Sequence, residues 1–154
     1  MSRIAKPYLF WSGAVAAAGA VLHVAIIFGG PDWYALFGAP EALVRMARTG
    51  NARAPISCLV IAAILACWAA YAFSGTGHLR RLPFLRPVLA LIAAVLTLRG
   101  SLFIPLLLWR PGALGPICSC HGVDGFIIVT SILCLVMGVG YGMGAIDARR
   151  KVGT

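Results

Sequence analysis

Three long stretches of this chain contain no Asp, Glu, Lys or Arg: residues 8–30, 54–77 and 125–146. A fourth stretch, residues 88–109, is interrupted by one charge, Arg99. A transmembrane α-helix needs about 20 mainly apolar residues. The pattern therefore predicts an all-α integral membrane protein, built as an antiparallel bundle of four transmembrane helices.

The composition agrees with a lipid environment. Apolar residues make up 61% of the 154-residue chain and charged residues only 11%, against roughly 25% charged in a typical soluble domain. So few charges cannot cover the surface of a soluble protein of this size. The length fits a single domain over residues 1–154. We expect the first span to be retained rather than cleaved, because its apolar run is longer than that of a signal peptide.

The positive charges are distributed unevenly along the chain. They border the apolar stretches without interleaved aromatics, which favours lipid headgroups and argues against nucleic acid. With the N-terminus inside, eight lie on the cytoplasmic side: Arg3, Lys6, Arg80, Arg81, Arg86, Arg149, Arg150 and Lys151. Four lie on the other side: Arg45, Arg48, Arg53 and Arg110. Because Lys and Arg are in excess in cytoplasmic loops, we expect a bacterial inner-membrane protein with both termini in the cytoplasm.

Small residues indicate how the helices pack. In a membrane, helices associate through close contact at glycine, alanine and serine. The last span carries two overlapping G-x-x-x-G pairs, formed by Gly138, Gly140, Gly142 and Gly144. In the first span, Ser12, Ala16, Gly19 and His23 fall on one face. We interpret both sets as contacts within one bundle, and the alternative is a homodimer face on the same glycines.

The first loop outside the membrane has helical signals of its own. Pro40 suits a first helical position, Glu41 follows in the first turn, and Arg45 and Arg48 fall in the last. Gly50 then supplies a stop. We predict a short amphipathic periplasmic helix over residues 40–49, which either anchors at the membrane interface or covers the end of the bundle.

Arg99 is the most unusual residue of the spans. It lies near the middle of the bilayer, where an arginine costs about 2.5–3.5 kcal/mol on insertion scales. Such a residue normally faces the bundle interior and has a partner. His23 is one candidate partner, because helix geometry places it within roughly 5 Å of the same depth. The others are Tyr71, backbone carbonyls near Pro105, and the hydroxyls of Thr97, Ser101, Thr130 and Ser131. The alternative is that Arg99 only braces the helices.

These considerations give a candidate ligand-binding site formed by Arg99, His23, Trp68 and Tyr71, covered by the loop helix at Glu41. Its ligand would be a lipid, a quinone or a small anionic molecule. The same features also fit an accessory subunit of another membrane protein. A small transporter is a third interpretation, although the two halves of the chain show no internal repeat of the kind that many transporters have.

A cysteine cluster supports a different function. Cys118, Cys120 and His121 precede the last span, and Cys58 begins the second span on the same side. A periplasm-facing thiol-redox or metal-handling protein would use these four residues. Against this, zinc ligands are usually spaced two to four residues apart, and the chain has no C-x-x-C pair. Structural cysteines are the third possibility.

Enzymatic chemistry has few candidate groups here. The chain holds four acidic residues in all, which leaves little for acid–base catalysis. It contains no phosphate-binding loop, no H-E-x-x-H and no G-x-S-x-G motif. We therefore expect a protein without catalytic activity, and the sequence specifies no cofactor.

Several short motifs resemble a family of small, uncharacterised four-helix inner-membrane proteins of Gram-negative bacteria. They are Gly29-Gly30-Pro31-Asp32-Trp33-Tyr34 with Phe37-Gly38-Ala39-Pro40-Glu41, Tyr71-Ala72-Phe73-Ser74-Gly75 with the segment 80–86, and Leu98-Arg99-Gly100. The resemblance covers roughly residues 20–145. It implies four helices and makes the first loop and Arg99 part of the family pattern. It implies no activity, and the cluster from Cys118 to His121 lies outside the pattern.

Overall fold

The computed structural model describes residues 5–109 and 125–150. Within these ranges the chain is helical and has no strand. The helices are α1 (Ala5–Gly29), α2 (Pro31–Leu36), α3 (Glu41–Arg48), α4 (Arg53–Thr76), α5 (Leu85–Trp109) and α6 (Gly125–Arg150). By length and composition, α1, α4, α5 and α6 can each cross a membrane. The predicted all-α four-helix bundle of a multi-pass membrane protein is confirmed.

Three of the long helices begin in the same way. In α1, α4 and α5 the third residue is a proline: Pro7, Pro55 and Pro87. The first four N–H groups of a helix have no partner within it, so a proline there removes no hydrogen bond and its fixed φ suits the helix. For this reason α1 and α5 begin three residues earlier than the apolar stretches alone indicate.

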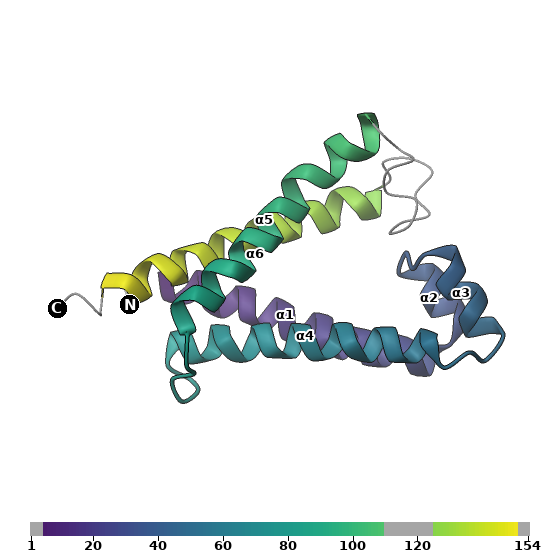
Figure 1. Ribbon diagram of the computed structural model, residues 1–154, viewed down its shortest axis with the longest axis horizontal. Coiled ribbons are helices and arrows are strands. Elements are labelled where there is room, and N and C mark those ends of the chain that lie inside the picture. Colours follow the sequence, from purple (N-terminus) through teal and green to yellow (C-terminus); the bar gives the residue numbers. More distant parts are fainter. Residues whose placement is uncertain (1–4, 110–124, 151–154) are drawn as a thin grey trace.

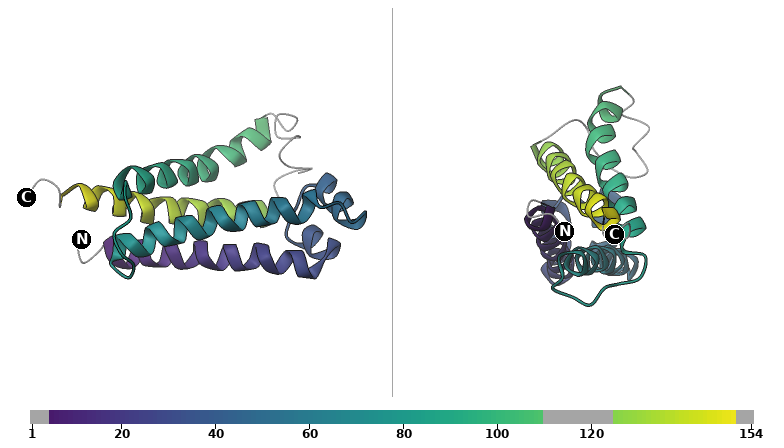
Figure 2. Two further views of the ribbon diagram at one scale, coloured as in Figure 1. Left: turned by 60° about the horizontal axis from the view of Figure 1, so that its bottom comes forward. Right: turned by 90° about the vertical axis from the view of Figure 1, so that its left-hand side faces the viewer.

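The four long helices are arranged as two pairs. Helix α1 packs along α4, α5 packs along α6, and the pairs meet mainly through α1 and α6. Both chain termini lie at one end of the bundle, which we call the terminal end (Figures 1 and 2). From there toward α2 and α3, the α5–α6 pair diverges from α1 and α4 (Figure 1). The main core cluster contains residues of all four helices, among them Leu9, Ala72, Leu89 and Tyr141.

The glycines of α6 separate into two faces. A Cβ atom on Gly144 would lie 2.8 Å from Cδ2 of Leu9 in α1, and one on Gly140 would overlap Ser12 of α1. A Cβ atom on Gly138 would instead lie 2.6 Å from Oγ1 of Thr97 in α5. The glycines thus allow close approach to α1 on one side and to α5 on the other, as expected of small-residue packing in membranes.

The loop between α1 and α4 folds back as two short helices, α2 and α3. They close over a second core cluster at the ends of the α1–α4 pair, formed by Ile26, Tyr34, Val44, Ala54 and Cys58. Helix α3 matches the helix expected from the local signals. Helix α2 was not expected, although Pro31 at its first position and Asp32 in its first turn are ordinary helix-start signals.

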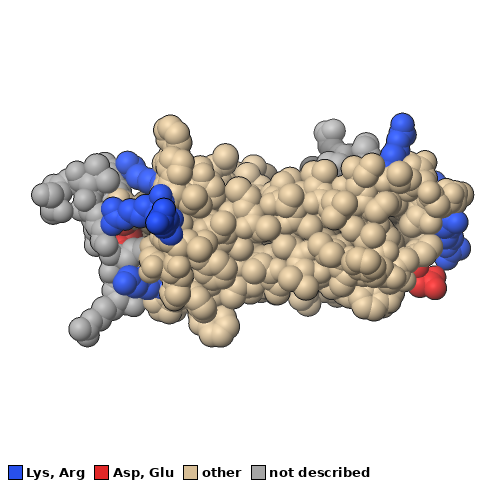
Figure 3. All heavy atoms as spheres, turned by 90° about the horizontal axis from the view of Figure 1, so that it is seen from below, with Lys and Arg blue, Asp and Glu red and all other residues tan. Residues whose placement is uncertain are grey.

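The surface has the charge pattern of a protein that spans a membrane. On the face seen in Figure 3, Lys and Arg lie at the two ends and none lies along the long apolar middle. Large apolar side chains such as Val21, Leu59, Leu91 and Val129 are exposed along the four long helices. In water these surfaces would be an aggregation hazard, whereas in a bilayer they face the acyl chains.

Candidate functional site

Arg99 lies on α5 where this helix packs against α6. The next residue, Gly100, makes the close contact, since a Cβ atom there would lie 2.8 Å from the carbonyl oxygen of Ser131. Arg99 itself is partly buried, and its Nη1 atom is fully buried. The side chain also interacts with other groups of the chain. The guanidinium group therefore faces protein rather than the outer surface, as expected of an intramembrane arginine.

Ser131 adds a second polar group to the same helix contact. Its side chain is 1% exposed, and within the described ranges its hydroxyl oxygen has no hydrogen-bond partner. Buried hydroxyl groups are normally bonded, and a serine in a helix usually donates to a carbonyl one turn earlier. The α5–α6 contact thus holds a cation and an unused hydroxyl in the middle of an apolar span.

The structure does not gather the other predicted site residues around Arg99. The His23 ring nitrogen Nδ1 lies 2.8 Å from the Gly19 carbonyl of its own helix, and over their described residues no Cα atoms of α1 and α5 lie within 8 Å of each other. Trp68 packs against the main core cluster, and its carbonyl accepts a hydrogen bond of 3.0 Å from the Tyr141 hydroxyl.

Tyr71 and Glu41 lie at opposite ends of the molecule. The Tyr71 hydroxyl donates to the Pro83 carbonyl at 3.3 Å, in the loop between α4 and α5. Glu41 begins α3 and forms an exposed ion pair of 2.9 Å with Arg45, four residues later on the same helix. Such an exposed pair contributes little to stability. The binding role of these two residues therefore stays a prediction without support from their position.

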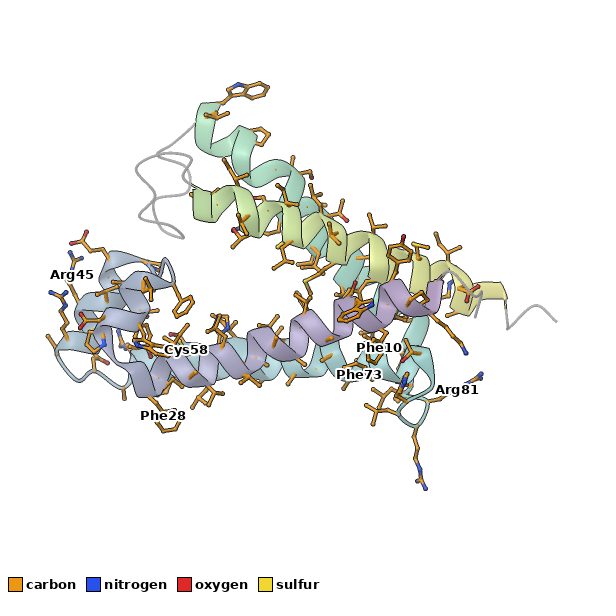
Figure 4. All side chains as sticks on the ribbon, turned by 180° about the vertical axis from the view of Figure 1, so that it is seen from behind. Phe10, Phe28, Arg45, Cys58, Phe73 and Arg81 are labelled. Carbon is orange, nitrogen blue, oxygen red and sulfur yellow. The ribbon has the colours of Figure 1, made fainter. Side chains whose placement is uncertain are left out.

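Of the predicted thiol cluster, only Cys58 belongs to the described residues, because Cys118, Cys120 and His121 lie outside them. Cys58 is buried under α2 and α3 (Figure 4). In the described ranges Cys58, Cys67 and Cys134 are free thiols, and no three His, Cys, Asp or Glu side chains group together there to hold a metal ion. The redox or metal site at the cysteines before α6 stays a prediction.

Cys58 has an unexpected neighbour in Tyr34. This tyrosine is 3% exposed, and its hydroxyl makes no hydrogen bond of ordinary geometry within the described ranges. Burial, and to a lesser degree the neighbouring Cys58 thiol, raises the pKa of Tyr34 from its ordinary value of 10.0 to about 12. A thiol is a weak hydrogen-bonding group, so we treat the pair as a buried polar contact. The sequence indicated only an aromatic at the membrane interface.

No family model, curated protein or solved structure matches this chain. The resemblance carried by the motifs around Pro31, Pro40 and Arg99 accordingly remains a prediction. Among the described residues, the α5–α6 contact places two buried polar atoms, Nη1 of Arg99 and the hydroxyl of Ser131, within apolar helices.

Proposed function

We propose that this protein binds a small lipid-soluble molecule through Arg99, at the contact between α5 and α6 in the middle of the bilayer. The ligand would present an anionic or carbonyl oxygen to the guanidinium group, as a lipid or a quinone does. The observation that carries this proposal is that one helix contact holds two buried polar atoms, Nη1 of Arg99 on α5 and the hydroxyl of Ser131 on α6. We infer no catalytic step.

Energetics support a role for Arg99 beyond helix packing. Small residues already bring α5 and α6 into contact at Gly100 and Gly138, so the contact does not require a charge. Keeping an arginine at this depth nevertheless costs about 2.5–3.5 kcal/mol on insertion scales. The acidic residue described on α6, Asp147, lies 16 positions beyond Ser131, or about 24 Å along a helix. A ligand that presents an oxygen atom to Arg99 within the membrane would offset the cost of keeping the arginine there.

The proposal extends to the setting of the protein. We infer a bacterial inner membrane, with the terminal end of the bundle in the cytoplasm. This inference rests on the excess of Lys and Arg at that end. An accessory role beside another membrane protein is compatible with the same site. The thiol or metal function would depend on Cys118, Cys120 and His121 and gains no support from the described residues.

Native mass spectrometry of the gently solubilised protein tests the proposed site. We expect the wild-type protein to retain an organic adduct and Arg99→Leu to lose it, while Arg99→Leu inserts normally because leucine favours the bilayer. Arg53→Leu is the matched control, because it removes an exposed arginine at the start of α4 and should retain the adduct. The proposal fails if Arg99→Leu carries every adduct that the wild type carries, or if neither protein carries one.

A further inference from the structure

A pocket lies at the terminal end of the bundle, away from Arg99. Its volume is about 420 Å³, and it is bounded by α1, the end of α4, the α4–α5 loop, the start of α5 and the end of α6. Three cations line it, Lys6 on α1, Arg81 in the loop and Arg86 on α5. The sequence showed these residues only as part of the positive charge at one membrane face.

The charges of this pocket are not balanced within it. Its described lining includes no acidic side chain, and Lys6, Arg81 and Arg86 form no ion pair with another described residue. Asp147 precedes the lining residue Ala148, but it is buried and already interacts with other groups. Three cations on the lining of one pocket repel one another, and a bound anion would relieve this repulsion. The first turn of α5 contains no acidic residue. The positive end of the α5 dipole therefore also favours an anion in the pocket.

The wall that carries Arg81 is held in a defined conformation. The buried Ser74 hydroxyl on α4 donates to the Arg80 carbonyl and accepts from the Leu82 N–H, both at 2.9 Å. At the end of the loop, Phe84 has a φ of 54°, a left-handed conformation that costs a residue with a side chain about 1–2 kcal/mol. Strained residues of this kind persist where the surrounding structure fixes them and are often found at binding sites.

The remaining lining is apolar. Leu82, Leu85 and Leu89 contribute to the pocket wall, and the Phe84 side chain, which also lines the pocket, is 79% exposed. The site therefore offers cations beside an apolar surface at the level where a transmembrane bundle meets the headgroups. A phosphate group attached to a carbon skeleton has the matching chemistry, since Lys and Arg are the usual phosphate-binding side chains.

We propose that this pocket binds a phosphate-bearing ligand, with Lys6, Arg81 and Arg86 around the phosphate and the leucines against its carbon skeleton. An anionic lipid headgroup and a soluble phosphate compound are the two sources of such a phosphate, and the experiment below distinguishes them. This site is independent of the proposed site at Arg99, because it lies at the membrane face rather than in the middle of the span.

Native mass spectrometry with added phosphatidylglycerol or phosphatidylcholine tests the pocket in the full-length protein. The wild type should retain the anionic lipid in preference to the zwitterionic one. The double variant Arg81→Gln and Arg86→Gln should bind it about twenty-five-fold more weakly, at about fivefold for each cation removed. Both side chains are exposed, so the glutamine double variant should fold. The double variant Arg81→Lys and Arg86→Lys keeps both charges and should keep most of the affinity.

A matched double variant at the other end, Arg45→Gln with Arg48→Gln, removes the same charge and should leave the affinity unchanged. Inorganic phosphate added as competitor distinguishes the sources: displacement of the lipid identifies a soluble phosphate ligand, and no displacement identifies a lipid headgroup. Equal binding by the wild type and the Arg81 and Arg86 variant would overturn the proposal, as would an equal loss in the matched control. Arg99→Leu should bind phosphatidylglycerol like the wild type, so failure of one site does not imply failure of the other.

Discussion

At the scale of single residues, the buried polar groups are the most informative. The hydroxyls of Tyr34 and Ser131 are buried without a hydrogen-bond partner of ordinary geometry in the described ranges. Each such group carries a desolvation cost of about 1–3 kcal/mol. Ser131 belongs to the same α5–α6 contact as Arg99, because a Cβ atom on Gly100 would lie 2.8 Å from the Ser131 carbonyl oxygen. Tyr34, on α2, instead packs beside Cys58 in the second core cluster, and its cost is therefore structural.

The position of Tyr34 leads to a prediction on pH and stability. The pKa of Tyr34 is raised from 10.0 to about 12 in the folded protein. Between these values an unfolded chain releases the Tyr34 proton while the folded chain retains it. The contribution of Tyr34 to the free energy of unfolding is thus fully present below pH 10 and is lost as the pH rises toward 12. Stability should fall over this window, as measured by thermal unfolding in detergent.

The variant Tyr34→Phe separates this effect from the other tyrosines. Removing a hydroxyl that has no partner should leave the protein equally stable or about 1 kcal/mol more stable at neutral pH, and the loss above pH 10 should become smaller. Tyr8→Phe is the control, because Tyr8 is 53% exposed and should leave the high-pH loss in place. If Tyr34→Phe destabilised the protein at neutral pH, the hydroxyl would have a partner after all.

At the scale of elements, the glycines of α6 set the distance between helices. Gly140→Ala should destabilise the bundle by about 1–3 kcal/mol, because the new Cβ atom would overlap Ser12 and lie 2.9 Å from the carbonyl oxygen of Tyr8. The higher helix propensity of alanine would offset up to about 1 kcal/mol of this loss. Unfolding in detergent, followed by circular dichroism against denaturant, measures the change.

Gly142→Ala provides the matched control for that prediction. It makes the same substitution half a turn away, but its Cβ atom would lie 3.8 Å from that of Ala93, an ordinary contact. It should therefore be neutral or slightly stabilising. Equal effects of the two variants would mean that α1 and α6 do not pack as closely as described.

The sequence predicted the elements well where local chemistry defines them. Apolar length determined the four long helices, and Glu41, Arg48 and Gly50 marked both ends of α3. Helix α2 was missed because its six residues are too few to show a period, and its Trp33 and Tyr34 read as interfacial aromatics. The sequence also could not predict which glycines of α6 contact α1 and which contact α5, because the residues between the glycines are equally apolar on both faces.

At the scale of the whole molecule, the lateral arrangement of helices decides which residues meet. Helix geometry placed His23 and Arg99 at similar depth, but depth along the membrane normal does not specify which helices are neighbours. Lipid-facing and helix-facing side chains are alike in polarity, so a hydrophobic pattern cannot identify the partner of a membrane helix. The pairing of α1 with α4 and of α5 with α6 therefore had to come from the structure. For the same reason the sequence could not predict a pocket bounded by Lys6, Arg81 and Arg86.

The orientation of the bundle in the membrane is the prediction that belongs to the whole molecule. A fluorescent protein fused after the C-terminus should fluoresce, because the terminal end carries eight Lys or Arg against four at the other end and should be cytoplasmic. Alkaline phosphatase needs the disulfides of an oxidising compartment. Inserted at the exposed turn of Gly50, it should be active. Replacing Arg80, Arg81 and Arg86 by Gln reduces the eight charges to five and should give a mixed orientation. A bundle that kept one orientation in that variant would show that charges other than these determine its topology.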